Sequence, residues 1–467
     1  MSIRVTGWAL GLAAAVAAMV LVLAQAARAQ EAVGEWHGVL SAMGAELRIG
    51  VVIESGPGGL TGHLTSPDQG PMKIPLAELR MEGDRLAFTA PSVRGRYEGR
   101  WDAARGAWSG TWTQVQPLPL VLEKGPVPPL VRNRPQVPAK PYPYREEEVA
   151  FDSLGGARLA GTLTLPQGPG PFPAAVLISG SGPQDRDETL AGHKPFLVLA
   201  DHLTRQGIAV LRYDDRGFAK STGDLATAAA AEFVADARAA VAFLRARPEI
   251  DAGKVGLVGH SEGGVVAPLV AADDPQIAYV VLLAGPGVPL GELLAAQRKA
   301  VYGVGGAPPE RIAQAQAILA RADAAVLAGS DFQAVKREVT SILTGALGLP
   351  AEAAAMQAGL MATPWYKWII GYDPRPALSR VRQPVLAVNG EKDLQVLADQ
   401  NLPAIRAALK ENPDVTVVEL PGLNHLFQTA TTGSPTEYGR IEETFDPAAL
   451  KVVGDWIVAR TRDRRPQ

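Results

Sequence analysis

The sequence predicts an α/β protein with a mostly parallel sheet and helices on both faces, preceded by a small all-β antiparallel domain. Three observations support this fold class. Residues 146–467 contain continuous apolar runs that alternate with helical segments, which is typical of strands buried on both faces. Residues 30–124 contain short alternating stretches separated by glycines and turn residues. A proline-rich segment at 125–145 separates these two patterns.

Composition restricts the chemistry that this chain can perform. The 467 residues are 47% apolar and 20% charged, which is enough to form more than one hydrophobic core. Lys and Arg number 45 against 48 Asp and Glu with no basic run, so nucleic acid is not an expected partner. The absence of Cys excludes a thiol nucleophile and cysteine-held metals. Ser, His, Asp and Glu must therefore carry the chemistry.

Residues 1–29 are predicted to be a signal peptide. Arg4 precedes the uncharged residues 5–27, and Ala27-Arg-Ala29 supplies small residues where a signal peptidase reads the chain. We expect cleavage after Ala29, export to the periplasm or the medium, and no stable membrane span afterwards. The alternative is a retained anchor, because an uncharged stretch of this length can cross a bilayer.

Residues 30–124 are predicted to form about seven or eight antiparallel strands of a small barrel or sandwich. Trp36, Trp108 and Trp112 are expected in its core. A scaffold role and a ligand-binding role both remain open for this domain. The following residues, 125–145, are expected to be a stiff linker because they include Pro at 126, 128, 129, 135, 138, 141 and 143.

The second domain, residues 146–467, contains six predicted strands and one long interruption. The strands are expected at 174–179, 208–213, 255–259, 279–283, 385–389 and 415–420, with helices at 228–247 and 397–410 among the segments between them. Residues 290–380 contain only Ala-rich helical stretches, which we interpret as a cap over the ligand crevice. A purely structural extension is the alternative.

Ser261 is the predicted nucleophile. It lies in Gly259-His-Ser-Glu-Gly263, between a buried strand and a helix, which is the context of a nucleophile elbow. Gly259 and Gly263 are needed because side chains there would collide with the adjoining strand and helix. The bare Gly-x-Ser-x-Gly pattern is weak, and its position after a strand makes it informative.

A serine hydroxyl needs a base and an acid that orients the base. Asp393 follows the strand at 385–389 and is the predicted acid, with Glu391 as the alternative. His425 is the predicted base, since it is the only His beyond that acid. The other three histidines of this domain, at 193, 202 and 260, are interpreted as structural.

Two backbone N–H groups are predicted to bind an oxyanion. The elbow supplies that of Glu262, and the small residues Gly180-Ser181-Gly182 supply the second, for which we favour Ser181. A plain turn is the alternative for that loop. The charged clusters at 184–187 and 214–216 are expected to brace it through ion pairs.

With Ser261, Asp393 and His425 in this order, residues 146–467 resemble the α/β-hydrolase superfamily of serine hydrolases, including the serine aminopeptidases. The blocks at 179–187, 212–217, 389–395 and 424–428 resemble bacterial carboxylesterases of the EstD type. The resemblance implies ester hydrolysis through a Ser-Asp-His triad without a metal. Leu397 departs from this family, where proline is expected.

The sequence therefore predicts a carboxylic ester hydrolase that forms an acyl-enzyme, uses no cofactor and acts on a small-molecule ester. Trp365, Tyr366 and Trp368 are candidates for the acyl pocket or, equally, for packing the cap on the core. An exported peptidase, an acyltransferase and a non-catalytic envelope-binding protein are the alternatives. No acidic pair that could hold the amino group of a peptide is evident from the sequence. The natural ester and the oligomeric state are left open.

Overall fold

The computed structural model describes residues 32–42, 45–68, 72–114, 117–128 and 133–462. The chain forms two compact units, Met1–Val131 and Arg132–Gln467, so the boundary falls within the proline-rich segment. The predicted signal peptide lies outside the described residues. No helix among the described residues has the length and hydropathy needed to cross a membrane.

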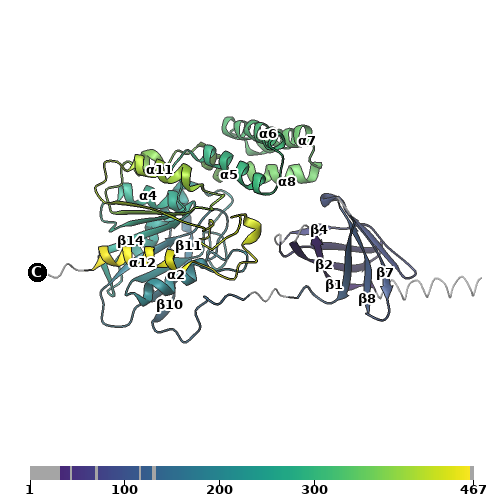
Figure 1. The fold of residues 1–467 in the computed structure, drawn as a ribbon, viewed down its shortest axis with the longest axis horizontal. Coiled ribbons are helices and arrows are strands. Elements are labelled where there is room, and N and C mark those ends of the chain that lie inside the picture. Colours follow the sequence, from purple (N-terminus) through teal and green to yellow (C-terminus); the bar gives the residue numbers. More distant parts are fainter. Residues whose placement is uncertain (1–31, 43–44, 69–71, 115–116, 129–132, 463–467) are drawn as a thin grey trace, which may run out of the picture. The chain divides into compact units, whose positions relative to one another are not determined.

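The described part of the first unit is an antiparallel sheet with the order β4-β3-β2-β1-β9-β8-β7-β6-β5 (Figure 1). Only Leu76 separates the two edge strands β4 and β5 in sequence, so the sheet curls until its edges meet, as in a small barrel. The strands are β1 (Gly34–Ala42), β2 (Ala45–Gly56), β3 (Gly59–Thr65), β4 (Lys73–Pro75), β5 (Ala77–Glu82), β6 (Arg85–Ala90), β7 (Gly95–Asp102), β8 (Ala107–Thr113) and β9 (Pro117–Lys124), with a 3-10 turn at Pro91–Val93.

Aromatic side chains fill the interior of this sheet. Trp36, Trp108 and Trp112 are buried as predicted, and Trp36 packs edge-to-face on Trp108 with ring centroids 6.1 Å apart. The Tyr97 hydroxyl donates to the Trp108 carbonyl at 2.9 Å. The described interior is therefore a packed core.

The second unit contains the predicted α/β sheet, with the order β10-β11-β13-β12-β14-β15-β16-β17. All six predicted strands are present: β12 (Phe172–Ile178), β13 (Ala209–Tyr213), β14 (Ile250–His260), β15 (Val280–Leu283), β16 (Val385–Gly390) and β17 (Val415–Leu420). These six pair in parallel. Two antiparallel strands, β10 (Arg145–Asp152) and β11 (Arg158–Leu165), extend one edge of the sheet. A 3-10 turn at Leu154–Gly156 connects them.

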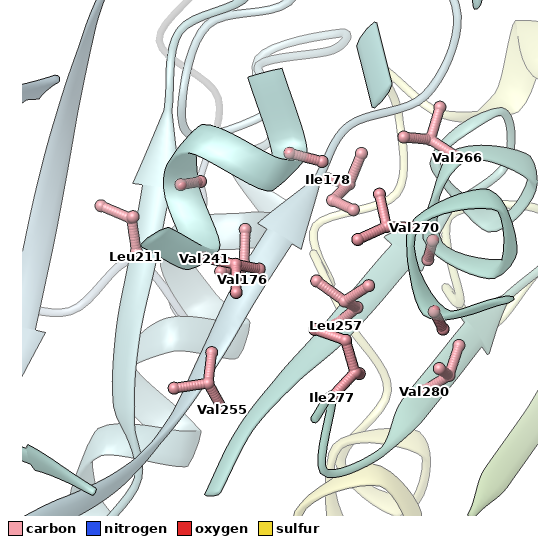
Figure 2. Packing of buried hydrophobic residues seen from close by; sticks show 14 of the residues in the cluster. Val176, Ile178, Leu211, Val241, Val255, Leu257, Val266, Val270, Ile277 and Val280 are labelled. Carbon is pink, nitrogen blue, oxygen red and sulfur yellow. The ribbon is translucent and has the colours of Figure 1, made fainter. Parts of the chain in front are cut away.

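Helices cover both faces of this sheet because successive strand residues point to opposite sides. Val176 packs in a cluster with α3 (Ala230–Arg245), α4 (Gly263–Asp273) and α11 (Ala398–Ala408), and Figure 2 shows it together with Leu257 and Val270. Leu177 packs on the opposite face in a cluster with α2 (Pro195–Arg205) and α12 (Pro447–Thr461). A double-sided core of this kind explains the continuous apolar runs.

Residues 290–380 are helical, as predicted, and contain no strand. The helices are α5 (Leu290–Val304), α6 (Pro309–Ala328), α7 (Phe332–Leu347), α8 (Ala351–Met361), α9 (Pro364–Gly371) and α10 (Arg375–Leu378), and α5 to α8 appear together in Figure 1. The apolar face of α6 joins α7 and α8 in a separate core that includes Leu319, Val326, Val339 and Ala358. The cap is therefore a folded layer rather than a loose extension.

The last part of the proline-rich segment is bound to the second unit. The Arg134 guanidinium donates to the carbonyls of Ile441, at 2.7 Å, and Ala191, at 3.1 Å. The side chain of Gln136 accepts a hydrogen bond from Thr444 N and donates one to the Phe445 carbonyl, both at 2.6 Å. Residues 134–136 are thus part of the surface of the α/β unit. A 3-10 turn at Pro435–Glu437 precedes the partner residues Ile441, Thr444 and Phe445 in sequence.

Candidate active site

Ser261 lies in the sharp turn between β14 and α4, at the carboxyl end of the parallel sheet. Its φ is 52°, in the left-handed region, and its N–H donates to the Leu283 carbonyl at 2.9 Å. A Cβ on Gly259 would lie 2.0 Å from the Gly263 carbonyl oxygen, and one on Gly263 would lie 2.2 Å from the Ile178 carbonyl oxygen. The two glycines therefore let the helix approach the strands closely and hold Ser261 in its strained conformation.

Asp393 and His425 meet at the same edge of the sheet. His425 Nδ1 lies 2.8 Å from Asp393 Oδ2, and the two side chains are 6% and 0% exposed. Asp393 Oδ1 accepts the backbone N–H groups of Gln395, at 2.7 Å, and Val396, at 2.9 Å. With its carboxylate held from the other side, Asp393 fixes the orientation of the imidazole.

The turn that carries His425 is shaped by Asn424. The Asn424 Oδ1 accepts the N–H groups of Leu426 and Gln428, both at 3.0 Å. Glu391, the alternative acid, is exposed and accepts the N–H of Gly422 at 2.8 Å. Within the described residues it has no contact with His425, and Asp393 holds the position beside that ring.

The two predicted oxyanion donors lie on different segments, Glu262 in the elbow directly after Ser261 and Ser181 in the loop after β12. Gly180 N–H donates to Glu188 Oε1 at 2.7 Å, so it is already engaged. Within the described part of the chain, the N–H groups of Ser181 and Glu262 donate to no protein acceptor. Both remain available for a negatively charged oxygen.

Ion pairs brace the loop that contains Ser181, as predicted. Arg186 binds Asp214 through two of its nitrogens, at 2.8 and 3.0 Å, and Asp187 pairs with the buried Arg212. These contacts tie residues 186–187 to the end of β13 and to the loop that follows it. Because all four charged side chains are mostly buried, the pairing holds the loop in one position.

A cavity of about 380 Å³ opens beside Gly180 and Glu262. The loops after β12 and β13 form one side of it, and Leu360, Thr363 and Trp365 of the cap region form another. Its apolar wall includes Leu225, Phe233 and Val266. The cap therefore closes over the carboxyl edge of the sheet, where ligands of open α/β sheets bind.

Two carboxyl groups, those of Asp215 and Glu262, line this cavity without a cationic partner among the described residues. Burial raises the pKa of Asp215 to about 8, although it accepts hydrogen bonds from the Ser179 hydroxyl and from Gln184 N–H. Burial likewise raises the pKa of Glu262 to about 7, against the opposing effect of the Trp365 indole N–H, which lies 3.0 Å from both carboxylate oxygens. The sequence analysis missed this acidic pair because its members are far apart in the chain.

Only one of the three aromatic pocket candidates lines the cavity. Trp365 forms part of its wall. Tyr366 points into the cap instead, where its hydroxyl donates to Asp323 at 2.7 Å and accepts from Arg298 at 2.8 Å. Trp368 packs against the cluster that joins the cap to the core. For Tyr366 and Trp368 the contacts agree with the packing alternative rather than the pocket, because successive residues of α9 point in different directions around the helix.

No group of three or more His, Asp or Glu side chains within the described ranges is arranged to hold a metal ion. The site contains two further residues that the sequence analysis did not assign to it, Glu188 and His260. His260 follows from the elbow motif itself, since it precedes Ser261. Glu188 carries no local signal beyond its place directly after the block at 179–187.

The parallel sheet, the helical cap and the strand–turn–helix at Ser261 define the class: the protein is an enzyme of the α/β-hydrolase fold. The sequence profile of the X-Pro dipeptidyl-peptidase (S15) family matches residues 155–425. The chain belongs to this family.

Among curated proteins, the chain is similar to Esterase EstD of Thermotoga maritima, with 29% identity over 320 residues that cover 68% of each chain. It is also similar to the mitochondrial acyl-coenzyme A thioesterase 2 of Rattus norvegicus, with 29% identity over 49% of this chain and 53% of the rat protein. Among solved structures, a Pyrococcus furiosus esterase aligns with a TM-score of 0.43 and 15% identity over 71% of this chain and 99% of its own.

Proposed function

We propose that this protein hydrolyses carboxylic esters through a triad of Ser261, Asp393 and His425. The observation that carries the proposal is the buried Asp393–His425 hydrogen bond of 2.8 Å at the sheet edge that also bears Ser261 in a strained turn. The similarity to Esterase EstD, an esterase by name, supports the ester as substrate.

In the proposed reaction, His425 Nε2 removes the proton of the Ser261 hydroxyl while Oγ attacks the acyl carbon. The N–H groups of Glu262 and Ser181 bind the oxygen that becomes negative. When the tetrahedral intermediate collapses, the alcohol leaves with the proton from His425 and an acyl-enzyme remains. Water then attacks this ester with the same base, releases the acid and restores the serine.

The cavity beside Glu262 is the proposed site for the body of the ester. Its volume of about 380 Å³ lies at the small end of the range for ligand pockets, and its walls are mainly apolar. We therefore expect a small ester with an apolar acyl or alcohol group, and an optimum at one acyl length.

The experiment is a set of initial rates on p-nitrophenyl esters of increasing acyl length. Ser261→Ala should lower kcat by about 10⁴-fold or more, as losses of triad members do. Ser379→Ala, at an exposed serine in the same unit, is the matched control and should keep the wild-type rate. Equal turnover by Ser261→Ala and wild type would remove Ser261 from its role. Added alcohols would separate hydrolysis from acyl transfer, because a transferase would form the new ester.

A second candidate function is the cleavage of aminoacyl or peptidyl substrates. The acidic pair of Asp215 and Glu262 favours it, because two carboxyl groups without a protein cation could bind a substrate ammonium group. The name of the X-Pro dipeptidyl-peptidase family is consistent with such substrates. Aminoacyl p-nitroanilides test it: turnover that exceeds that of esters and is lost in Asp215→Asn would favour the peptidase.

Export is a separate proposal and rests on the leader at residues 1–29. N-terminal sequencing of the protein from periplasmic and medium fractions should find a chain that begins at Gln30. An intact N-terminus in the membrane fraction would indicate an anchor instead.

A further inference from the structure

A second pair of an acid and a histidine lies beneath the proposed triad. Glu188 and His260 are 3% and 6% exposed, and Glu188 Oε1 lies 2.8 Å from His260 Nδ1. Glu188 belongs to the loop after β12 and has a φ of 53°, while His260 is the last residue of β14. Neither residue has a role in the reaction described above.

The pair connects the Gly180–Ser181 loop to the His425 loop, whose relative position matters for the proposed reaction. Glu188 Oε1 also accepts the N–H of Gly180, at 2.7 Å, next to the proposed oxyanion donor Ser181. On the other side, His260 Nε2 lies 3.0 Å from the carbonyl oxygen of His425, and the two imidazole rings are 4.8 Å apart. One chain of hydrogen bonds therefore runs from the Gly180 N–H through Glu188 and His260 to the backbone of His425.

The contacts of His260 restrict where its protons can lie. Its Nδ1 faces a carboxylate oxygen and its Nε2 faces a carbonyl oxygen, and both of these groups only accept. With Glu188 as a carboxylate, each nitrogen must carry a proton, which makes His260 an imidazolium and the two residues an ion pair. Burial by itself would lower the pKa of His260, but the charge and hydrogen bond of Glu188, the carbonyl of His425 and the charge of Asp393 raise it above the ordinary value.

We propose that Glu188 and His260 are positioning residues of the Ser261 reaction: the buried ion pair holds the Gly180–Ser181 loop and the His425 loop in one relative placement. The inference rests on the proposed function, since it assigns both loops their roles. It also explains why Ser181, rather than Gly180, is left to bind the oxyanion, because the Gly180 N–H is already bound to Glu188.

Glu188→Gln tests the charge with little change of shape. The amide can still accept a hydrogen bond, but His260 loses its counter-ion and, being buried, gives up a proton at lower pH. A neutral His260 can donate from one nitrogen only, so one of its two contacts is lost. We expect kcat to fall by about 10²-fold with little change in KM, the cost typical of a small misplacement of reacting groups.

The pH profile separates positioning from plain destabilisation. In the wild type, kcat should decline on the alkaline side when His260 deprotonates, and Glu188→Gln should move this decline to lower pH. Glu188→Asp keeps the charge and should restore the alkaline limb at least in part. A folded Glu188→Gln variant with wild-type kcat and an unmoved alkaline limb would overturn the proposal.

His193→Asn is the matched control. His193 is also fully buried and engages both ring nitrogens, with the Thr444 hydroxyl at 3.0 Å and the Tyr438 carbonyl at 2.8 Å. Its loss should lower thermal stability while leaving kcat and the alkaline limb near wild type. If His193→Asn shifts both as much as Glu188→Gln does, the effect is general destabilisation and the proposal fails.

A measurement on the unaltered protein covers the case in which the variants do not fold. Nitrogen-15 NMR of labelled histidines should show one side chain protonated on both ring nitrogens at pH 8, and a His260 that is neutral at that pH would contradict the proposal. Failure of the proposed function gives a different pattern, because wild-type and Ser261→Ala rates would then be equal whatever happens at Glu188.

Discussion

Replacing Ser261 with glycine should remove activity and, at the same time, stabilise the protein relative to Ser261→Ala. Ser261 has a φ of 52°, a conformation that an L-residue with a Cβ adopts at a cost and that glycine adopts freely. Its N–H donates to the Leu283 carbonyl at 2.9 Å, a contact that either substitution retains. Both variants lose the hydroxyl, so the comparison isolates the backbone strain.

The expected magnitude follows from two opposing contributions. A left-handed conformation costs an ordinary residue about 1–2 kcal/mol relative to glycine. Glycine loses more conformational entropy on folding than alanine, which returns about 0.4–1 kcal/mol. The difference leaves Ser261→Gly more stable than Ser261→Ala by about 1 kcal/mol, which corresponds to about 2 °C in Tm for a unit of this size.

Differential scanning calorimetry of both variants at one pH measures this difference, with p-nitrophenyl ester turnover measured alongside. The reasoning predicts the order Gly above Ala in Tm and no turnover in either. A Ser261→Gly variant that melts at or below Ser261→Ala would show that the turn is not strained, and measurable turnover by the glycine variant would contradict the role of the hydroxyl.

Three other substitutions have defined outcomes. Gly263→Ala places a Cβ 2.2 Å from a backbone oxygen of β12 and should cost about 2–3 kcal/mol in urea unfolding, whereas Gly345→Ala in α7, with no atom within 4 Å, should be neutral or stabilising. For Asp215→Asn, the Tm should increase relative to that of the wild type as the pH rises from 5 to 8. The unfolded wild-type Asp215 releases its proton near pH 4, whereas the folded one, with a pKa of about 8, keeps it, so folding of the wild type becomes less favourable over this range. A Tm difference that stays constant from pH 5 to 8 would refute the raised pKa. Trp365→Phe removes the indole donor that stabilises the charged carboxylate, so the pKa of Glu262 should rise above about 7 in carbon-13 NMR, and a fall would contradict the contact.

The parallel strands were predictable because each is apolar on both faces and therefore continuous in sequence. The antiparallel strands β10 and β11 were not predicted. β10 lies at the edge of the sheet, where Glu146, Glu147 and Glu148 leave it with a polar surface. The burial of β10 alternates along the strand, so its sequence lacks the continuous apolar run that identified the central strands.

The candidate acid and base were predictable from chain order and from scarcity. His425 is the only histidine after the strand at 385–390, and Asp393 follows that strand directly. The choice between Asp393 and Glu391 depended on position alone, and the structure places Asp393 against the imidazole and turns Glu391 toward Gly422. Only Lys392 separates these acids, which is enough to send one inward and the other to the surface.

The parts of the site that sequence could not provide are contacts between distant loops. Glu188 and His260 are 72 residues apart, and His260 reaches the backbone of a residue 165 positions further on. A lone acid in a charged loop and a histidine beside a nucleophile each have ordinary explanations when considered alone. Only their shared hydrogen-bond chain gives them a common role, because it links the loop at Gly180 to the loop at His425. The residues that orient a reaction are thus harder to predict than those that perform it, since their identity depends on what the fold places around them.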